Sequence, residues 1–524
     1  MHTHARLSRA VLASKPARGT RRPATGLLKW CAAAALLATT AAHAAEVKIF
    51  GAHPQGQALS RAEMARPADV PDKGSFPVSV NLRQLRKLPI QGEAELNLPD
   101  GRRMVVVHDE THRSESGNHT FVGHLRDHGK DFRVIITEAP NGLANGIVTL
   151  PEGGLRLEGR TGQTWLIDPQ RAGIGYAPLA EPRLPDTLSS AVQRKLEAAA
   201  AEEKGQGDEA RIQPLAQSTV DMMVVYTPNM VSRYGGDAGA RARIDSQMAI
   251  FNQILRDSAV EVTARLVKAL YVNQDDNVNQ GTLLTMITNG QGAFANVRPE
   301  RDAAKADVVH LLHKPTVGVG SCGIAYLSVT KGPTGHADWA YGVTDDNCPT
   351  MVMAHEVGHN FGMNHDHAQG GGEPVFPYAW GYIVPGTNYG DVMSYAGTHY
   401  YKYSNPRIGG CSGQACGQDG WADAARAINE TKGIVANYRI GARTPACFYE
   451  HANYAGKVLC STTDNPWVGA SWNDIISSVR VPAGTRVTLY EHANYQGRAL
   501  VLTSDTSLVP ADFNDKTSSF RVAR

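Results

Sequence analysis

The pattern of hydrophobic and polar positions divides the chain into regions of different character. Between residues 45 and 217, short β-branched and aromatic runs predict strands at 103–107, 120–123 and 132–137. Turn signals fall between or after these runs, at Asn141-Gly142, Asn145-Gly146 and Gly153-Gly154. No group of residues suited to catalysis accompanies them. This region therefore reads as a β-rich domain without chemistry of its own.

Residues 218–440 combine helix and strand patterns. The periodicity predicts a helix at 240–257, strands at 262–272 and 307–313, and a closing helix at 421–438. These elements indicate a domain that contains both helices and strands.

Beyond a linker at 441–445, the chain repeats itself. YEHANYAG at 449–456 returns as YEHANYQG at 490–497, and NDIISS at 473–478 returns as NDKTSS at 514–519, both after 41 residues. A repeat of this kind indicates duplication of one β unit, so the C-terminal region is expected to be all-β.

The strongest chemical signal is HEVGHNFGMNHD at residues 355–366. His355 and His359 are four residues apart, so on a helix they share one face and both can bind one zinc ion. Gly362 suits the left-handed turn that ends such a helix and returns His365 to the same metal. Three neutral imidazoles leave a coordination position open, which is typical of catalytic zinc.

Glu356 stands beside these ligands and is expected to act as the general base on water that the zinc activates. Two further histidines, His310 and His313, lie in the apolar run at 307–313. Since His355, His359 and His365 already complete the expected set of zinc ligands, we interpret these two as ordinary strand histidines.

With Met393 in DVMSY at 391–395, the motif resembles that of the metzincin metalloproteases. In that family the methionine lies in a tight turn under the metal, which implies that Met393 forms an apolar floor below the histidines. Asp366, directly after the third histidine, and VDMMVVYTP at 220–228 resemble the reprolysin-like bacterial branch. Some members of that branch are described as peptidyl-Asp endopeptidases. The resemblance covers residues 218–440 and implies an α+β fold with a mixed, twisted sheet and an active-site helix.

Tyr395 departs from that branch. Its spacing from the methionine is similar to that of the astacin and serralysin branches, where the tyrosine approaches the zinc. Three roles stay open: stabilising the oxyanion, ligating resting zinc and moving aside, or packing below the site. Asp366 is expected to anchor its loop. Residues 318–327 resemble the edge strand along which metzincins align a peptide by β-augmentation.

The repeated C-terminal unit resembles the paired Greek keys of a βγ-crystallin domain, in which the Asn-Asp-x-x-Ser-Ser stretch binds calcium. Hard oxygen ligands suit calcium. The ligands that the resemblance implies are the side chains of Asp474, Ser477, Asp515 and Ser518, with the backbone carbonyls of Ile475 and Lys516. The alternative is that these residues form polar turns that bind no metal.

Charge and cysteine content limit which binding partners and which cellular compartment the sequence suggests. The formal net charge of the 524 residues is +2, which favours neither nucleic acid nor an acidic partner. Of seven cysteines, Cys31 lies in a segment expected to be removed, and an even number in a secreted chain indicates disulfides. The clustering of the other six suggests the pairs Cys322–Cys348, Cys411–Cys416 and Cys447–Cys460, although fifteen pairings are formally possible.

The N-terminus has the pattern of a secretory signal peptide. Basic residues without acidic ones fill 1–28, a short apolar run follows at 30–42, and AHA at 42–44 is a cleavage signal. The apolar run is too short to anchor the mature protein in a membrane. The expected organisation is a signal peptide at 1–44, a propeptide at 45–217, a zinc metalloprotease domain at 218–440 and a βγ-crystallin-like domain at 445–524.

An Ala- and Glu-rich stretch at 193–210 reads as an exposed helical or disordered linker, where cleavage would release the enzyme. No cysteine lies between residues 45 and 217, so a thiolate cannot cover the zinc before activation. A propeptide carboxylate or simple steric cover both remain open.

These features predict a secreted zinc endopeptidase, made as a preproenzyme, that acts on proteins or peptides. One alternative is a non-catalytic, calcium-binding adhesin that retains a protease fold, and Glu356 argues against it because such a protein needs no base there. Another is a zinc hydrolase that acts on non-peptide amides. The edge-strand segment argues against it, because such a strand favours an extended peptide as the substrate.

Overall fold

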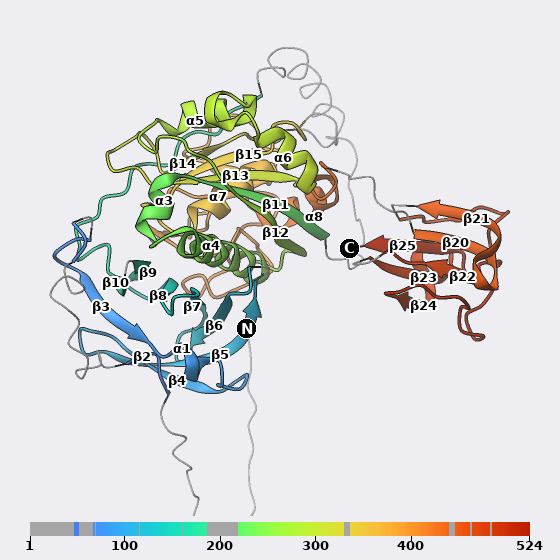
Figure 1. Cartoon of the computed structure of the whole chain (residues 1–524), viewed down its shortest axis with the longest axis horizontal. Coiled ribbons are helices and arrows are strands. Elements are labelled where there is room, and N and C mark those ends of the chain that lie inside the picture. The colour runs from blue at the N-terminus through green and yellow to red at the C-terminus, as the bar shows by residue number, and fades with distance from the viewer. Residues whose placement is uncertain are drawn as a thin grey trace, which may run out of the picture. The chain divides into compact units, whose positions relative to one another are not determined.

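The computed structural model describes residues 47–51, 66–68, 70–114, 116–160, 162–185, 218–329, 336–439, 446–461, 464–482 and 485–523. The expected signal peptide and the linker at 193–210 lie outside these residues. Within the described part of the chain, no helix is long and apolar enough to cross a membrane. The elements form a ten-stranded sheet, a domain of helices around a five-stranded sheet, and two three-stranded sheets (Figure 1).

The N-terminal sheet has the strand order β1-β4-β5-β6-β7-β8-β9-β10-β3-β2. From β4 to β10, each strand pairs with the next in an antiparallel meander. The bounds are β1 (Val47–Lys48), β2 (Phe50–Gly51), β3 (Ser75–Val80), β4 (Glu93–Asn97), β5 (Arg103–Arg113), β6 (His119–Leu125), β7 (Gly129–Glu138), β8 (Ala144–Leu150), β9 (Gly153–Arg160) and β10 (Gln163–Ile167), with the short helix α1 (Leu82–Leu85) after β3. The three strands expected from the sequence are therefore confirmed, as parts of β5, β6 and β7.

Both faces of this sheet bury apolar side chains, because successive residues of a strand point to opposite faces. Val134 and Val148 lie in the core of the sheet's own domain. Ile135 and Ile147, on the opposite face, share a core with residues of helix α4 (Asp237–Asp257). Polar contacts add to this packing: Asp245 of α4 accepts hydrogen bonds from Ser114 and Asn118, each at 2.7 Å.

The second sheet has the order β12-β11-β13-β15-β14. Its strands are β11 (Ser218–Tyr226), β12 (Val262–Tyr271), β13 (Val308–His313), β14 (Gly323–Ala325) and β15 (Tyr341–Asp345). The first four in that order are parallel to their neighbours, whereas β14 runs antiparallel to β15 and forms the edge. The expectation of a mixed sheet is confirmed.

Helices cover both faces of this sheet (Figure 1). They are α3 (Pro228–Arg233), α4, α5 (Gln280–Asn289), the 3-10 turn η3 (Gly292–Phe294), α6 (Val297–Ala304), α7 (Val352–Asn360) and α8 (Ala424–Val435). Met222 and Val224 of β11 share a core with residues of α4, α7 and α8. Met223 and Val225, on the other face, pack with residues of α5 and α6. Full burial on both faces explains why β11 is continuously apolar from Met222 to Tyr226 rather than alternating.

Short strand pairs and disulfides shape the loops after α7. Strand β16 (Asn364–Asp366) pairs with β17 (Trp380–Gly381), and β18 (Tyr389–Gly390) pairs with β19 (Thr398–His399). The three disulfides are Cys322–Cys348, Cys411–Cys416 and Cys447–Cys460, which confirms the pairs that the clustering suggested.

The C-terminal region forms the sheets β21-β20-β22 and β24-β23-β25. The bounds are β20 (Ala446–His451), η4 (Ala452–Tyr454), β21 (Ala455–Ser461), β22 (Ser478–Arg480), β23 (Arg486–His492), η5 (Ala493–Tyr495), β24 (Gln496–Leu502) and β25 (Ser519–Ala523). Phe448 and Phe520, one from each repeat, are buried and stack at 4.0 Å between ring centroids. A β-bridge between Val479 and Thr506 also joins the repeats, and the duplicated units share one core.

One turn signal was wrong. Asn145 and Gly146 lie inside β8 and are buried. A Cβ on Gly146 would lie 2.0 Å from the carbonyl oxygen of Ile135 in β7, so glycine is needed for close approach of two strands. The Asn145 side chain accepts a hydrogen bond from Gly159 N at 3.1 Å. Gly153 and Gly154 open β9, after the turn.

Two expected elements are shorter in the structure. The closing helix begins at Ala424, because the Asp423 side chain accepts a hydrogen bond from Arg426 N and caps the helix there. Trp421 instead stacks on His367, with ring centroids 3.6 Å apart. The edge strand is reduced to Gly323–Ala325.

The packing under α7 generates a test with a matched control. A Cβ on Gly358, inside α7, would lie 2.5 Å from Met393 Sδ, whereas a Cβ on Gly433, inside α8, would meet nothing within 4 Å. Alanine favours helix by about 1 kcal/mol over glycine. We expect Gly433→Ala to raise the free energy of unfolding slightly and Gly358→Ala to lower it by about 1–3 kcal/mol through overpacking. Urea unfolding of both variants measures this, and equal effects at the two positions would contradict it.

Candidate active site

Helix α7 places His355 and His359 one turn apart, and both side chains are fully buried. Nδ1 of His355 lies 2.8 Å from the carbonyl oxygen of Val392, and Nδ1 of His359 lies 2.8 Å from that of Met363. A carbonyl oxygen can only accept, so each Nδ1 carries the proton and each Nε2 presents a lone pair. The backbone thus fixes the tautomer that a metal ligand requires.

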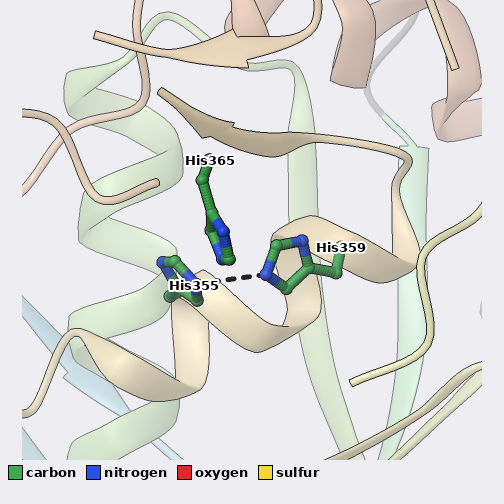
Figure 2. A group of neighbouring side chains, drawn as sticks. All are labelled: His355, His359 and His365. Carbon is green, nitrogen blue, oxygen red and sulfur yellow. Dashed lines mark hydrogen bonds between the residues drawn. The ribbon is translucent and has the colours of Figure 1, made fainter. Parts of the chain in front are cut away.

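The two Nε2 atoms face each other at 3.1 Å, along the dashed line in Figure 2. With both Nδ1 atoms protonated, two lone pairs meet there and no proton lies between them. Two zinc–nitrogen bonds of about 2.05 Å at a tetrahedral angle would place the nitrogens roughly 3.3 Å apart. The spacing therefore fits two ligands of one zinc ion.

His365 completes the group from strand β16, and its ring points toward the other two in Figure 2. Gly362 has a φ of 98°, so the left-handed turn expected after the helix is present. One ligand atom from each of His355, His359 and His365 lies within 4.8 Å of the others. Among the described residues, this is the one such group of three or more His, Cys, Asp or Glu side chains.

Burial keeps the three imidazoles neutral. It lowers the pKa of His359 to about 4, and it also lowers the pKa values of His355 and His365 well below the usual value of a histidine. Neutral imidazole is the form that binds metal, so the donor set fits zinc at neutral pH.

Glu356, next to the first ligand, is fully buried in α7. Neither of its carboxylate oxygens has a hydrogen-bond partner among the described residues, and burial raises its pKa well above the usual value of a glutamate. A Cβ at position 323 would lie 2.4 Å from Oε1, so Gly323 of the edge strand leaves room for this side chain. A buried carboxyl group without a partner is costly and marks a place where another group is expected to bind.

The Met393 turn lies beneath the helix. Asp391 is buried, and its carboxylate accepts hydrogen bonds from the backbone N–H groups of Tyr382, Met393 and Ser404 at 3.0, 3.1 and 2.8 Å. Burial raises the pKa of Asp391 to about 7. The turn packs Met393 against α7 and brings the Val392 carbonyl to His355.

Tyr395 lies at the metal group. Its hydroxyl oxygen is 3.3 Å from His365 Nε2, and the rings are 4.3 Å apart. Its backbone N–H donates to the Asp366 carboxylate at 3.0 Å, and Ala368 N donates to the same carboxylate at 3.1 Å. Asp366 therefore holds both the Tyr395 turn and its own loop.

His310 and His313 lie in β13, away from the metal group. His310 Nε2 hydrogen-bonds the Thr344 hydroxyl at 2.9 Å, and His313 Nδ1 donates to the Asp276 carbonyl at 3.0 Å. Both have hydrogen-bond partners in the core, as expected for strand histidines.

The repeated C-terminal loops bring one pair of the expected calcium ligands together, one residue from each repeat. Ser477 Oγ of the first repeat lies 2.8 Å from Asp515 Oδ1 of the second. Asp474 and Asp515 have φ values of 57° and 56°, so both loops adopt the same left-handed conformation. The backbone N–H of Asp474 donates to the Thr517 carbonyl, and the backbone N–H of Asp515 donates to the Ile476 carbonyl. Thr517 and Ile476 each follow directly after a residue whose carbonyl is an expected calcium ligand, Lys516 and Ile475.

One residue at the site escaped the sequence patterns. Glu181, from the region before the catalytic sheet, places Oε1 3.5 Å from His365 Nδ1. No spacing or composition pointed to it, because only the fold brings residue 181 near residue 365. Gly323 was likewise not singled out, since its role depends on a side chain of another element.

Three segments match protein-family models. Residues 216–406 match metallo-peptidase family M12, residues 442–502 match peptidase inhibitor family I36, and residues 56–172 match the BamI lipocalin-like domain.

Similar proteins include two named peptidyl-Asp metalloendopeptidase. One from Pseudomonas aeruginosa is 30% identical over 251 residues, which cover 43% of this chain and 41% of that protein. One from Stenotrophomonas maltophilia is 27% identical over 232 residues, covering 42% of this chain and 53% of that protein. The chain thus spans about half the length of the curated relatives it matches. A solved βγ-crystallin domain from Clostridium beijerinckii is 33% identical and covers 15% of this chain and 98% of its own, with a TM-score of 0.15.

The buried strand histidines give a pH test. Burial lowers the pKa of His310 to about 3, whereas an unfolded histidine titrates near 6.5. Between these values the unfolded chain binds more protons than the folded one, so stability falls as the pH falls. For His310 alone, the loss between pH 7 and pH 5 should be about 2 kcal/mol. Urea unfolding of the chelator-treated protein and of His310→Asn at both pH values measures this. An unchanged pH dependence in the variant would contradict it.

Proposed function

We propose that this chain, whose residues 216–406 carry a domain of metallopeptidase family M12, is a zinc-dependent endopeptidase with a metzincin catalytic fold. The observation that carries the proposal is a buried carboxylate without a hydrogen-bond partner, Glu356, beside three buried, neutral imidazoles. This pairing of a metal site with a base is what the hydrolysis of an amide requires.

His355, His359 and His365 would hold the zinc, with the tautomers of the first two fixed by backbone carbonyls. Bound zinc would polarise the scissile carbonyl and lower the pKa of a water molecule toward neutrality. Glu356 takes the proton of the attacking water on its carboxylate and later delivers it to the leaving amine.

Tyr395 is suited to donate a hydrogen bond from its hydroxyl to the developing oxyanion. Its hydroxyl lies at the metal group, and burial raises its pKa, which keeps the phenol protonated. Met393 keeps an apolar floor under α7, and Asp366 fixes the position of the Tyr395 turn.

A peptide is the substrate that the edge strand favours. β14 lies at the edge of the sheet beside Glu356, and residues 178–183 of the chain already hydrogen-bond to this edge, as an extended substrate would after their removal. The name of the similar proteins makes peptides with aspartyl residues the first substrates to test.

The precursor organisation is part of the same proposal. A signal peptide at 1–44 would direct export of the precursor. Residues 45–217 would be a propeptide, and its removal would release the enzyme of residues 218–440. Three disulfides fit an oxidising compartment. The alternative of a non-catalytic adhesin gives no reason for burying the Glu356 carboxyl group without a partner, at a cost to stability.

Replacing Glu356 tests the base directly. In Glu356→Gln the side chain keeps its shape but cannot take a proton, so turnover of casein should fall by about 10²–10⁴-fold while the zinc content stays at the wild-type value. Both proteins should first receive the same limited proteolysis to remove the propeptide.

Glu430→Gln is the control, since Glu430 lies on α8 and pairs with Arg426. It should cleave casein at the wild-type rate. Wild-type turnover by Glu356→Gln would show that another group is the base.

We also propose that residues 445–524 form a βγ-crystallin-like domain that binds calcium through Asp474, Ser477, Asp515 and Ser518. The crossed pairing of Ser477 with Asp515, and the matching loop conformations, support this. Each loop supplies a carboxylate, a hydroxyl and backbone carbonyls, which are hard ligands suited to calcium.

Calcium should therefore raise the unfolding temperature of this domain, because it binds the folded loops and not the unfolded chain. At a concentration 100-fold above the dissociation constant, the gain in stability is about 2.7 kcal/mol. Thermal unfolding of residues 445–524 in millimolar calcium and in chelator measures the shift. The variant carrying Asp474→Ala and Asp515→Ala should not respond, and an unresponsive wild-type domain would mean that the loops are only turns.

A further inference from the structure

A cavity of about 580 Å³ lies where residues of the proposed propeptide meet the catalytic domain. Among its lining residues, the propeptide contributes Arg160 and residues 174–177, and the catalytic domain contributes Arg233, Lys314 and residues 315–321. Three of these residues, Arg160, Arg233 and Lys314, carry a positive charge. A cavity of this volume is large enough to hold a ligand or a side chain of a bound peptide.

The cavity adjoins the edge strand that the proposed function assigns to the substrate. Ser321 lines the cavity and lies two residues before Gly323, the residue that faces the Glu356 carboxylate. That separation is about 7 Å along an extended chain. A peptide that pairs antiparallel with this edge, which is the commoner arrangement of strands, has the residues after its scissile bond on the side of the cavity. The side chain of one of the first three residues after that bond can therefore reach the cavity.

The catalytic domain supplies an excess of positive charge beside the cavity. Arg243 and Lys314 are buried and share one carboxylate, that of Asp346, at 2.8 and 3.2 Å. Arg233 adds a third cation, and Asp345, which also lines the cavity, adds a second carboxylate. Three cations thus face two carboxylates on this side. Because an uncompensated charge is costly in a buried place, such a group favours the binding of a further anion.

In the full chain, a carboxylate of the proposed propeptide lies among these cations. Glu158 of β9 is fully buried, and its Oε2 lies 3.4 Å from Nη2 of Arg233. Burial disfavours the charged form of Glu158, but the positive charges of Arg156, Arg160 and two cations of the catalytic domain outweigh it and hold the pKa of Glu158 well below its usual value. The cations of the catalytic domain therefore already accommodate one ionised acidic side chain.

We propose that this cavity is, in the mature enzyme, the subsite for an acidic side chain that follows the scissile bond of the substrate, and that Arg233 and Lys314 recognise that side chain. The inference rests on the proposed function and deepens it, because it names the residues that select the peptide. Removal of the propeptide takes Glu158 away with β9, and the substrate carboxylate then lies beside Arg233 in its place. The guanidinium group suits this role, since its planar fork binds a carboxylate through two parallel hydrogen bonds.

The test uses the full chain after limited proteolysis of the propeptide, and pairs of peptides that differ only in Asp or Asn at the first, second or third position after the cleaved bond. At one of these positions the wild-type enzyme should cleave the Asp peptide with a kcat/KM at least about tenfold above that of the Asn peptide. Arg233→Gln should bring this ratio close to unity. Arg241→Gln is the matched control, because Arg241 lies on α4 and pairs with Asp237, and it should keep the wild-type ratio. The ratio is taken within one protein, so a smaller folded fraction does not change it.

Two further measurements separate recognition from a loss of structure. Arg233→Glu should reverse the preference, so that Lys is favoured over Asp at the same position, which a misfolded enzyme cannot produce. In the Glu356→Gln background, fluorescence anisotropy should show the same preference for the Asp peptide in binding alone.

A wild-type enzyme that cleaves peptides without an acidic preference at these positions would overturn the subsite while the proposed function stands. An Arg233→Gln variant that keeps the wild-type ratio would do the same. If the wild-type enzyme cleaves neither these peptides nor casein, the proposed function and this inference both fail.

Discussion

The site depends on one constraint: two imidazole nitrogens are held with their lone pairs pointing at each other. Nε2 of His355 and Nε2 of His359 are 3.1 Å apart, and hydrogen bonds from both Nδ1 atoms to carbonyls fix this state. Two lone pairs that face each other at this distance repel when no cation lies between them. A bound zinc ion converts the same arrangement into two coordinate bonds.

The elements around α7 can be understood from that constraint. The left-handed turn at Gly362 brings the Met363 carbonyl to His359 and sends the chain on to His365. The turn around Asp391 brings the Val392 carbonyl to His355, and three backbone donors hold that turn by the buried carboxylate. The turn that carries Met393 therefore supports the helix, and the carbonyl of its neighbour Val392 also sets the tautomer of His355.

The sequence predicted the parts of the site that are local and missed those that depend on packing. Three histidines and a glycine at fixed spacing require only helix geometry and one turn, so the grouping of the three histidines could be predicted. Glu181 could not, because its position follows from a segment laid along an edge strand about 140 residues later. Gly146 shows the same limit in the fold, since a glycine needed for strand contact looks like a turn glycine in the sequence. Disulfide pairs were predictable because their partners lie close in the chain.

The central claim is that the three histidines hold one catalytic zinc ion, and metal analysis of the purified full chain tests it most directly. After growth with zinc and extensive dialysis, the wild-type protein should contain about one zinc per chain, bound at the histidines rather than at surface groups. The variant carrying His355→Ala and His359→Ala should contain less than about a tenth of that amount, with its three disulfides intact. Stoichiometric zinc in the variant, or none in the wild-type protein, would contradict the account.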